Sequence, residues 1–199
     1  MGFEFMSGFP GSIGGNIYMN ASAHKQCISD NLIKVKVFDT EKKEVIELPK
    51  NELGFSYRTS ILQSKPYILL DTEFELKKGN KEEIKQTILN NREFRKAHQP
   101  QALPNVGSIF RNPEGDSAGR MLDEIGAKSF KIGGAKVFEN HANFIINDNN
   151  ATSTDVLELM LMMYNKVKEK YNVKLRPEVK YFGKQTDREK EICTILFQK

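Results

Sequence analysis

GFPGSIGGNIYMN, residues 8–20, holds four glycines and one proline among small and apolar residues. Because glycine has no Cβ, its backbone N–H groups can approach an anion closely. The spacing is not the GxGxxG of a dinucleotide-binding Rossmann loop, and the GK[ST] of a P-loop is absent. The stretch therefore predicts a phosphate-binding loop of another kind, in which Gly8, Gly11, Gly14 and Gly15 face a pyrophosphate.

The 199 residues, 39% of them hydrophobic, suffice for one large domain or two small ones. Lys and Arg number 30 against 26 Asp and Glu, and the net charge of +4 is spread along the chain, which indicates a small anionic ligand rather than a nucleic acid. No stretch approaches the ~20 apolar residues that span a bilayer, and the N-terminus lacks a signal-peptide pattern. We therefore expect a cytoplasmic monomer without a membrane partner.

The two cysteines, Cys27 and Cys193, lie far apart in the sequence and show neither CxxC nor metal-ligand spacing. Such usage favours free thiols in a reducing compartment over a disulfide framework. We accordingly expect no metal site.

Alternation of apolar and polar residues predicts an antiparallel sheet in the first third of the chain. LIKVKVF at 32–38 and VIEL at 45–48 flank the charged turn TEKKE and indicate a β-hairpin. YILLDTEFEL at 67–76 indicates a third strand. We therefore expect a glycine-rich loop followed by this sheet.

Helix caps and apolar periodicity organise the remainder of the chain. Three helices are predicted: 81–98 with Asn80 as the N-cap, 118–125 with Asp116 or Ser117 as the N-cap and Gly126 as the stop, and a longest helix to 171 with Thr152 as the N-cap. Strands are predicted within 107–113, at the end of 136–147 and over 173–183, where Pro177 marks an edge.

Five blocks of the sequence occur in the order typical of one family. They are GFPGSIGGNIYMNASA (8–23), FSYRTSIL (55–62), QPQALPNVGSIFRNP (99–113), GRMLDEIGAKSFKIGGAKVFENHANFIIN (119–147) and LRPEVKYFG (175–183). Together they resemble the UDP-N-acetylenolpyruvoylglucosamine reductase (MurB) family, with the shorter type II subclass as the nearer likeness.

The resemblance implies an α+β chain with two domains. Residues 1–78 would be part of a FAD-binding domain of the vanillyl-alcohol-oxidase (PCMH) type, and residues 79–185 a small α/β domain that binds a UDP-sugar. Residues 186–199 would be a C-terminal tail, which the resemblance does not cover and to which the sequence assigns no partner.

In that family NADPH reduces a bound FAD, which then delivers hydride to UDP-N-acetylglucosamine enolpyruvate. The product is UDP-N-acetylmuramate, a peptidoglycan precursor. The resemblance therefore implies an oxidoreductase, a UDP-N-acetylmuramate dehydrogenase, with FAD and NADPH as cofactors and a UDP-sugar as its small-molecule partner. The residues implied to contact FAD are Gly8, Pro10, Gly11, Ser12, Gly14, Gly15, Asn20 and Ala21.

Three residues match the family's catalytic positions: Arg58 in SYRTS, Ser108 in VGSIF and Glu178 in RPEV. Hydride addition pushes negative charge into the substrate carboxylate, so cationic or hydrogen-bonding groups must meet it. The resemblance implies that the planar guanidinium of Arg58 binds this carboxylate through two hydrogen bonds. It also implies that Glu178 lies opposite in a protonated or strongly hydrogen-bonded form, and that Ser108 donates the final proton. Considered alone, the same residues would be a surface ion-pair arginine, a rim carboxylate and a turn serine.

The UDP-sugar would meet Lys96 in REFRKAHQP and Asn112 in IFRNP, by the same resemblance. A lysine ammonium neutralises phosphate, and an amide can bond uracil or phosphate oxygens. Tyr57 either lines this site or packs as a core aromatic. We interpret His141 as structural or as a residue that supports the site without contacting the substrate, because the family's reaction needs no histidine.

The sequence departs from the family pattern in two places. AHKQ at 23–26 stands where the family usually has AYG. The family's flavin domain also begins with further strand and helix segments and a second glycine-rich loop, which this chain does not contain. We therefore expect the chain alone to bind FAD weakly and to show little activity. The alternative is an inactive remnant or a UDP-sugar-binding module without flavin.

Overall fold

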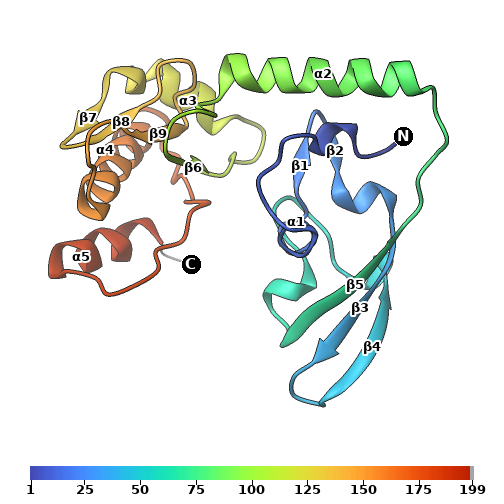
Figure 1. Ribbon diagram of the computed structural model, residues 1–199. Coiled ribbons are helices and arrows are strands. Elements are labelled where there is room, and N and C mark those ends of the chain that lie inside the picture. Colours follow the sequence, from blue (N-terminus) through green and yellow to red (C-terminus); the bar gives the residue numbers. More distant parts are fainter. Residues whose placement is uncertain (198–199) are drawn as a thin grey trace. The chain divides into compact units, whose positions relative to one another are not determined.

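The computed structural model describes residues 1–197 and divides into two compact units, which are taken separately below (Figure 1). The first unit is Met1–Phe94 and the second begins at Arg95, so the division falls inside the long helix α2 (Lys81–His98). Both units mix helices and strands, which confirms the α+β class. The functional borders at 78/79 and 185/186 stay predictions.

The first unit contains a three-stranded antiparallel sheet in the order β4-β3-β5 (Figure 1). Its strands and helices are β1 (Ser22–Ala23), β2 (Gln26–Cys27), β3 (Leu32–Asp39), β4 (Glu44–Pro49), β5 (Tyr67–Phe74), α1 (Ile13–Tyr18) and most of α2, with 3-10 turns η1 (Glu4–Met6), η2 (Ile28–Asn31), η3 (Lys50–Glu52) and η4 (Ile61–Gln63). The predicted hairpin and the predicted third strand are confirmed.

One face of this sheet carries the core of the first unit. Val35 and Val37 of β3 are at most 1% exposed, and Leu48 of β4 lies opposite Val35. Because side chains alternate across a strand, Lys34, which precedes Val35, reaches the other face, where its ammonium lies 2.8 Å from the Glu47 carboxylate. Ile17 of α1 belongs to the same core cluster, so the glycine-rich segment is attached to the sheet.

The expectation that residues 8–20 form a loop is wrong for their second half, because Ile13–Tyr18 is the helix α1. The Ser12 hydroxyl accepts a hydrogen bond from the Gly15 N–H at 3.1 Å, so Ser12 is the N-cap that starts this helix. Gly8, with φ of +82°, lies ahead of it in a left-handed conformation that glycine adopts readily. The short β1–β2 hairpin that follows was not predicted.

The second unit contains a four-stranded antiparallel sheet in the order β6-β9-β8-β7. Its elements are β6 (Asn105–Ser108), β7 (Lys131–Ile132), β8 (Ala135–Val137), β9 (Phe144–Asn147), the helices α3 (Ala118–Glu124), α4 (Ser153–Tyr171) and α5 (Asp187–Leu196), and the 3-10 turn η5 (Ala127–Ser129). Its core joins β8 and β9 to the apolar faces of α3, α4 and α5.

The predicted helix boundaries are confirmed at their caps. Asn80 Oδ1 accepts from the Glu82 N–H at 2.8 Å at the start of α2, and Ser117 rather than Asp116 caps α3. Thr152 forms a capping box at the start of α4. Within residues 1–197, no helix is long and apolar enough to cross a membrane.

The strand predicted over 173–183 is wrong. These residues lie outside every strand, and only Pro177 makes an isolated bridge, to Phe110. Proline has no N–H to donate, so a regular ladder cannot pass through it. The strand predicted within 107–113 lies earlier, as β6, because the residues after Ser108 bond a side chain in place of a regular neighbouring strand.

Within the segment predicted from the sequence as a tail, Asp187–Leu196 forms the helix α5 with Thr186 as its N-cap, and residues 198–199 lie outside the described residues. Ile192 is fully buried and Leu196 is 3% exposed, and both belong to the core of the second unit. The sequence had assigned this segment no partner; the structure packs it against α4.

Candidate active site

In the first unit, Arg58 lies in a tight turn formed by Ser56–Thr59. Its backbone has φ of +55°, a strained value for a residue with a Cβ. Two side chains hold this turn: Asn20 Nδ2 donates to the Ser56 carbonyl at 3.1 Å, and Gln63 Nε2 donates to the Arg58 carbonyl at 3.0 Å. Sequence elements far apart in the chain therefore fix the position of the arginine.

The Arg58 guanidinium contacts Ser22 and Tyr57. Nη1 donates to the Ser22 hydroxyl at 2.8 Å, and the guanidinium carbon lies 5.2 Å from the centre of the half-exposed Tyr57 ring. Ser22 pairs with Cys27 across the β1–β2 hairpin, and burial raises the pKa of the Cys27 thiol. Tyr57 therefore accompanies Arg58 at the surface and does not pack in the core.

The glycine-rich segment leaves room for a ligand. A Cβ placed on Gly14 would lie 3.8 Å from Leu69, and one on Gly15 would lie 3.5 Å from the Ser12 hydroxyl, both ordinary contacts. The chain's own packing therefore does not require glycine at these two positions. Gly8, Pro10, Gly11 and Ser12 are likewise exposed.

Asn20 and Ala21 differ from these exposed residues. Asn20 is 6% exposed, and its Oδ1 is buried with no hydrogen-bond partner among the described residues. An orphaned buried acceptor of this kind calls for a donor from outside the chain or from water. Ala21 is buried, and its N–H and C=O bond Asn16 and Ile28, so its backbone is fully occupied within the chain.

In the second unit, the backbone brings Ser108 and Glu178 to adjacent positions. The Glu178 N–H donates to the Ile109 carbonyl at 2.8 Å, directly beside Ser108 at the end of β6. On the other side of Pro177, the Arg111 N–H donates to the Arg176 carbonyl at 2.8 Å. Ser108 and Glu178 are each half-buried.

The side chain of Asn143 takes the place of a strand beside Phe110. Its Oδ1 accepts from the Phe110 N–H at 2.9 Å, and its Nδ2 donates to the Phe110 carbonyl at 2.8 Å. The Asn143 carbonyl also accepts from the Ile109 N–H at 2.9 Å. Asn143 is 4% exposed, so these bonds lie in the interior, where an unsatisfied group is costly. Asn143 was not predicted as a site residue, although it stands in the ENHANF motif.

His141 supports Asn143. Its Nδ1 accepts from the Asn143 N–H at 3.2 Å, which requires Nδ1 to be unprotonated. Its ring meets Phe144 edge-on, with the centres 4.8 Å apart, and a Cβ on Gly119 would lie 3.2 Å from its Cε1. Burial lowers the pKa of His141. These contacts support the interpretation of His141 as structural.

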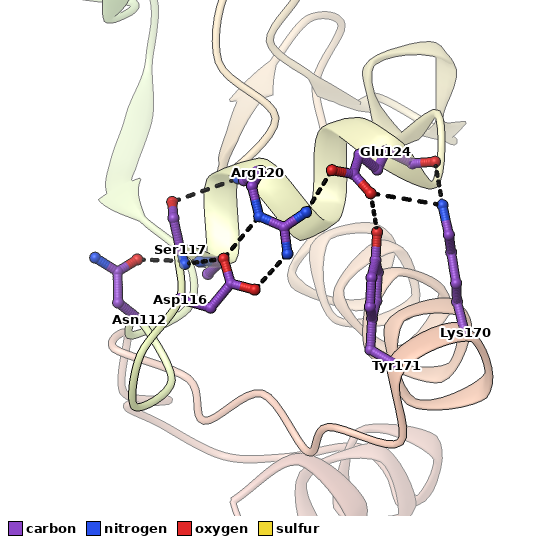
Figure 2. A network of polar contacts seen from close by, with 8 residues as sticks. Asn112, Asp116, Ser117, Arg120, Glu124, Lys170 and Tyr171 are labelled. Carbon is purple, nitrogen blue, oxygen red and sulfur yellow. Dashed lines mark hydrogen bonds and ion pairs between the residues drawn. The ribbon is translucent and has the colours of Figure 1, made fainter.

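A network of polar contacts holds the loop that carries Asn112 (Figure 2). Asn112 Oδ1 accepts from the Ala118 N–H at 3.1 Å, at the start of α3. Arg120 binds Asp116 through Nε and Nη2 and binds Glu124 through Nη1. The guanidinium and the Ser117 N–H together lower the pKa of Asp116 to about 2.

The same network reaches α4. The Tyr171 hydroxyl donates to Glu124 Oε2 at 2.5 Å, and Lys170 Nζ donates to the Glu124 carbonyl at 3.0 Å (Figure 2). These two bonds connect the end of α3 to the end of α4. The loop of Asn112 is therefore anchored to a rigid part of the second unit.

Lys96 is exposed on the last turn of α2, whereas the adjacent Arg95 is 8% exposed. Burial lowers the pKa of Arg95. Lys96 is thus the residue of this pair that a ligand in solution can reach. Lys96, Ser108, Asn112 and Glu178 belong to the second unit, and Arg58 and Tyr57 to the first. Among the residues that the structure describes, no group of three or more His, Cys, Asp or Glu side chains could hold a metal ion.

Comparisons with known proteins identify the family and fold type of the chain. A family model described as UDP-N-acetylenolpyruvoylglucosamine reductase, C-terminal domain, matches residues 99–182. A UDP-N-acetylenolpyruvoylglucosamine reductase from Caldanaerobacter subterraneus subsp. tengcongensis is 46% identical over 92% of this chain and 61% of its own length. A protein of the same name from Bacillus licheniformis is 44% identical over 92% of this chain and 99% of its own length.

The crystal structure of UDP-N-acetylenolpyruvylglucosamine reductase (MurB) from Thermus caldophilus is 34% identical in sequence and superposes with a TM-score of 0.77, covering 90% of this chain and 64% of that one. Fold and matches together define an α+β protein of the MurB type. The chain belongs to the UDP-N-acetylenolpyruvoylglucosamine reductase family, which confirms the resemblance read from the sequence. It spans about 61% of the length of the Caldanaerobacter relative.

Replacing Asn143 tests whether its amide holds the backbone of Phe110, just beyond the end of β6. Asn143→Ala leaves the buried N–H and C=O of Phe110 without partners, so we expect the free energy of unfolding to fall by about 2–4 kcal/mol. Urea denaturation followed by circular dichroism measures this change. Asn149→Ala, at an exposed asparagine of the same unit, is the matched control. A loss below about 0.5 kcal/mol would contradict the role assigned to the buried amide.

His141 gives the second unit a pH-dependent stability. Because its pKa is lower in the folded protein, the unfolded chain binds a proton near pH 6.5 that the folded chain does not. We expect the free energy of unfolding to fall as the pH drops from 7.5 through 6.5, and to fall less in His141→Asn, whose amide oxygen can accept from Asn143. Urea denaturation across this pH range measures the slope. His24→Asn, at an exposed histidine of the first unit, is the control, and equal slopes in wild type and His141→Asn would refute the assignment.

Proposed function

We propose that this chain reduces UDP-N-acetylglucosamine enolpyruvate to UDP-N-acetylmuramate, the reaction that the family resemblance implies. The observation that supports the proposal is the backbone hydrogen bond from the Glu178 N–H to the Ile109 carbonyl, which joins Glu178 to the residue next to Ser108 at the end of β6. A candidate proton donor and a candidate electrostatic partner therefore occupy adjacent positions, as the reaction needs.

The first unit supports a flavin cofactor. Gly14 and Gly15 offer backbone that a bulky ligand can approach, and Asn20 Oδ1 is a buried acceptor without a partner among the described residues. We propose that these residues, with Gly8, Pro10, Gly11 and Ser12, contact FAD. When bound there, FAD would supply the hydride that originates from NADPH. Ala21 would contribute by packing, because its backbone groups are already bonded.

The remaining roles follow from charge and position. Arg58 would bind the substrate carboxylate, since its planar guanidinium presents paired donors and the Ser56–Thr59 turn is held by Asn20 and Gln63. Glu178 would face the developing charge, and Ser108 would donate a proton to the substrate carbon. Lys96 and Asn112 would bind the UDP-sugar, with Tyr57 beside Arg58.

Several finer statements belong to the same proposal. A cytoplasmic location, a monomeric state, the dependence on NADPH and weak FAD binding by the chain alone stay predictions. The alternative is a UDP-sugar-binding module without flavin chemistry. It is favoured by one observation: four of the six proposed catalytic and substrate-binding residues lie in the second unit, which has a core of its own.

Removing the Ser108 hydroxyl separates the two half-reactions. With FAD supplied in excess, Ser108→Ala should leave the reduction of FAD by NADPH unchanged, because the hydroxyl plays no part in that step. Reoxidation by the enolpyruvyl sugar should slow by about 10²-fold or more, the usual contribution of a proton donor. Stopped-flow absorbance of the flavin measures both rates. Ser129→Ala is the control within the same unit, and equal losses in both half-reactions would show that Ser108 does not donate the proton.

Lys96 tests the UDP-sugar site without flavin. Lys96→Ala should weaken the binding of UDP-N-acetylglucosamine enolpyruvate about tenfold, because one charge-assisted contact to phosphate is lost. Isothermal titration calorimetry on the 199-residue chain measures the dissociation constant. Lys85→Ala, at another exposed lysine of α2, should leave it unchanged. Unaltered binding by Lys96→Ala would exclude this lysine from the site, and binding without any flavin reaction would favour the alternative function.

A further inference from the structure

The segment after Glu178 has little backbone support. Residues 176–178 make two backbone bonds, to Ile109 and Arg111 on either side of Phe110, and Pro177 between them cannot donate one. Val179 and Tyr181 pack partly against the core, while Phe182 is fully exposed. Glu178, a candidate catalytic residue, therefore lies at the start of a segment whose position depends on contacts further along the chain.

The Tyr181 hydroxyl makes such a contact. It lies 3.2 Å from Glu189 Oε2 and 3.0 Å from the Lys184 carbonyl. Glu189 belongs to α5, outside residues 99–182, which the family model matches. Contact with α5 therefore begins three residues after Glu178.

The Glu189 carboxylate is buried, with the residue 2% exposed, and is surrounded by donors. Oε1 accepts from the Ser153 hydroxyl at 2.5 Å and from the Thr154 hydroxyl at 3.2 Å, and Oε2 accepts from the Thr186 N–H at 2.8 Å. Ser153 and Thr154 open α4, and Thr186 caps α5. The first turns of two helices therefore converge on one carboxylate, where their dipoles favour negative charge.

The bonds from Ser153 and Thr186 lower the pKa of Glu189 to about 2, so the carboxylate stays ionised near neutral pH. The helix that carries it is itself held in place. Ile192 and Leu196 are buried in the core, and Arg188 Nε donates to Glu158 of α4 at 2.6 Å. Glu189 is therefore fixed independently of the segment that it binds.

We propose that Glu189 is a positioning residue for Glu178. Through its contact with the Tyr181 hydroxyl, which we call the clasp, α5 holds residues 178–186 near the start of α4 and so fixes the backbone of Glu178 next to Ile109. The inference rests on the proposed function for the role of Glu178. The clasp itself does not depend on it.

Tyr181→Phe tests the clasp in the full chain. The variant removes one hydroxyl and leaves the capping box of α5 intact. We expect the Glu178 amide to exchange with solvent about tenfold faster, the effect of losing one hydrogen bond that holds the segment. We also expect a shift of the Glu178 ¹³Cδ resonance. Amides of β8 and β9 should exchange as in wild type, which separates a local release from loss of the fold.

Glu189→Gln removes an acceptor and should have the same effect at Glu178, together with weaker capping of α5. Tyr171→Phe is the matched control, because it removes another tyrosine hydroxyl that bonds a glutamate in the same unit. If Glu189→Gln fails to fold, Tyr181→Phe alone decides. Unchanged exchange and an unchanged ¹³Cδ resonance at Glu178 in Tyr181→Phe would overturn the clasp, since a purely structural role for Glu189 predicts that result.

These measurements use neither flavin nor substrate. If Tyr181→Phe releases Glu178 but the wild-type chain does not reduce the enolpyruvyl sugar even with NADPH and FAD in excess, then the clasp stands and the proposed function fails. If exchange at Glu178 is unaltered while reduction proceeds, the proposed function stands and the clasp is overturned.

Discussion

The buried amide of Asn143 is the interaction on which the candidate site of the second unit depends. It bonds both the N–H and the C=O of Phe110, as a residue of a neighbouring strand would do. Every buried backbone polar group needs a partner, and beyond Ser108 the regular ladder with β9 no longer supplies one. The Asn143 side chain bonds the backbone of Phe110 on one side of the chain. The backbone groups of Ile109 and Arg111 that point to the other side pair with residues 176–178, which include Glu178.

Much of this architecture follows from local sequence signals. Period-two alternation predicted the strands near β3, β4 and β5, and the caps Asn80, Ser117 and Thr152 predicted where three helices begin. Such signals succeed because a helix cap is satisfied within its own first turn and a strand face within a few residues. The catalytic candidates were found from motifs, and the structure places Ser108 and Glu178 in adjacent positions.

The features that escaped prediction depend on residues distant in the sequence. Asn143 and Phe110 are 33 residues apart, and Glu189 and Ser153 are 36 apart. Neither pair produces a periodic pattern. The β7–β8 hairpin was not predicted, for another reason. Its turn is Gly133-Gly134, and a Cβ on Gly134 would lie 2.1 Å from the Asn149 carbonyl oxygen. That glycine is required by close packing, which the sequence alone does not reveal.

Pro177 determines how the segment that contains Glu178 is held. Pro177 has no N–H to donate, so the backbone bonds of Arg176 and Glu178 flank a residue that adds none of its own, and a contact further along the chain adds to the hold on this segment. Glu189 provides that contact through Tyr181 while also capping its own helix. Because one carboxylate serves both purposes, the folding of α5 and the placement of Glu178 are coupled, and a helix outside the family-model match becomes part of the support for the site.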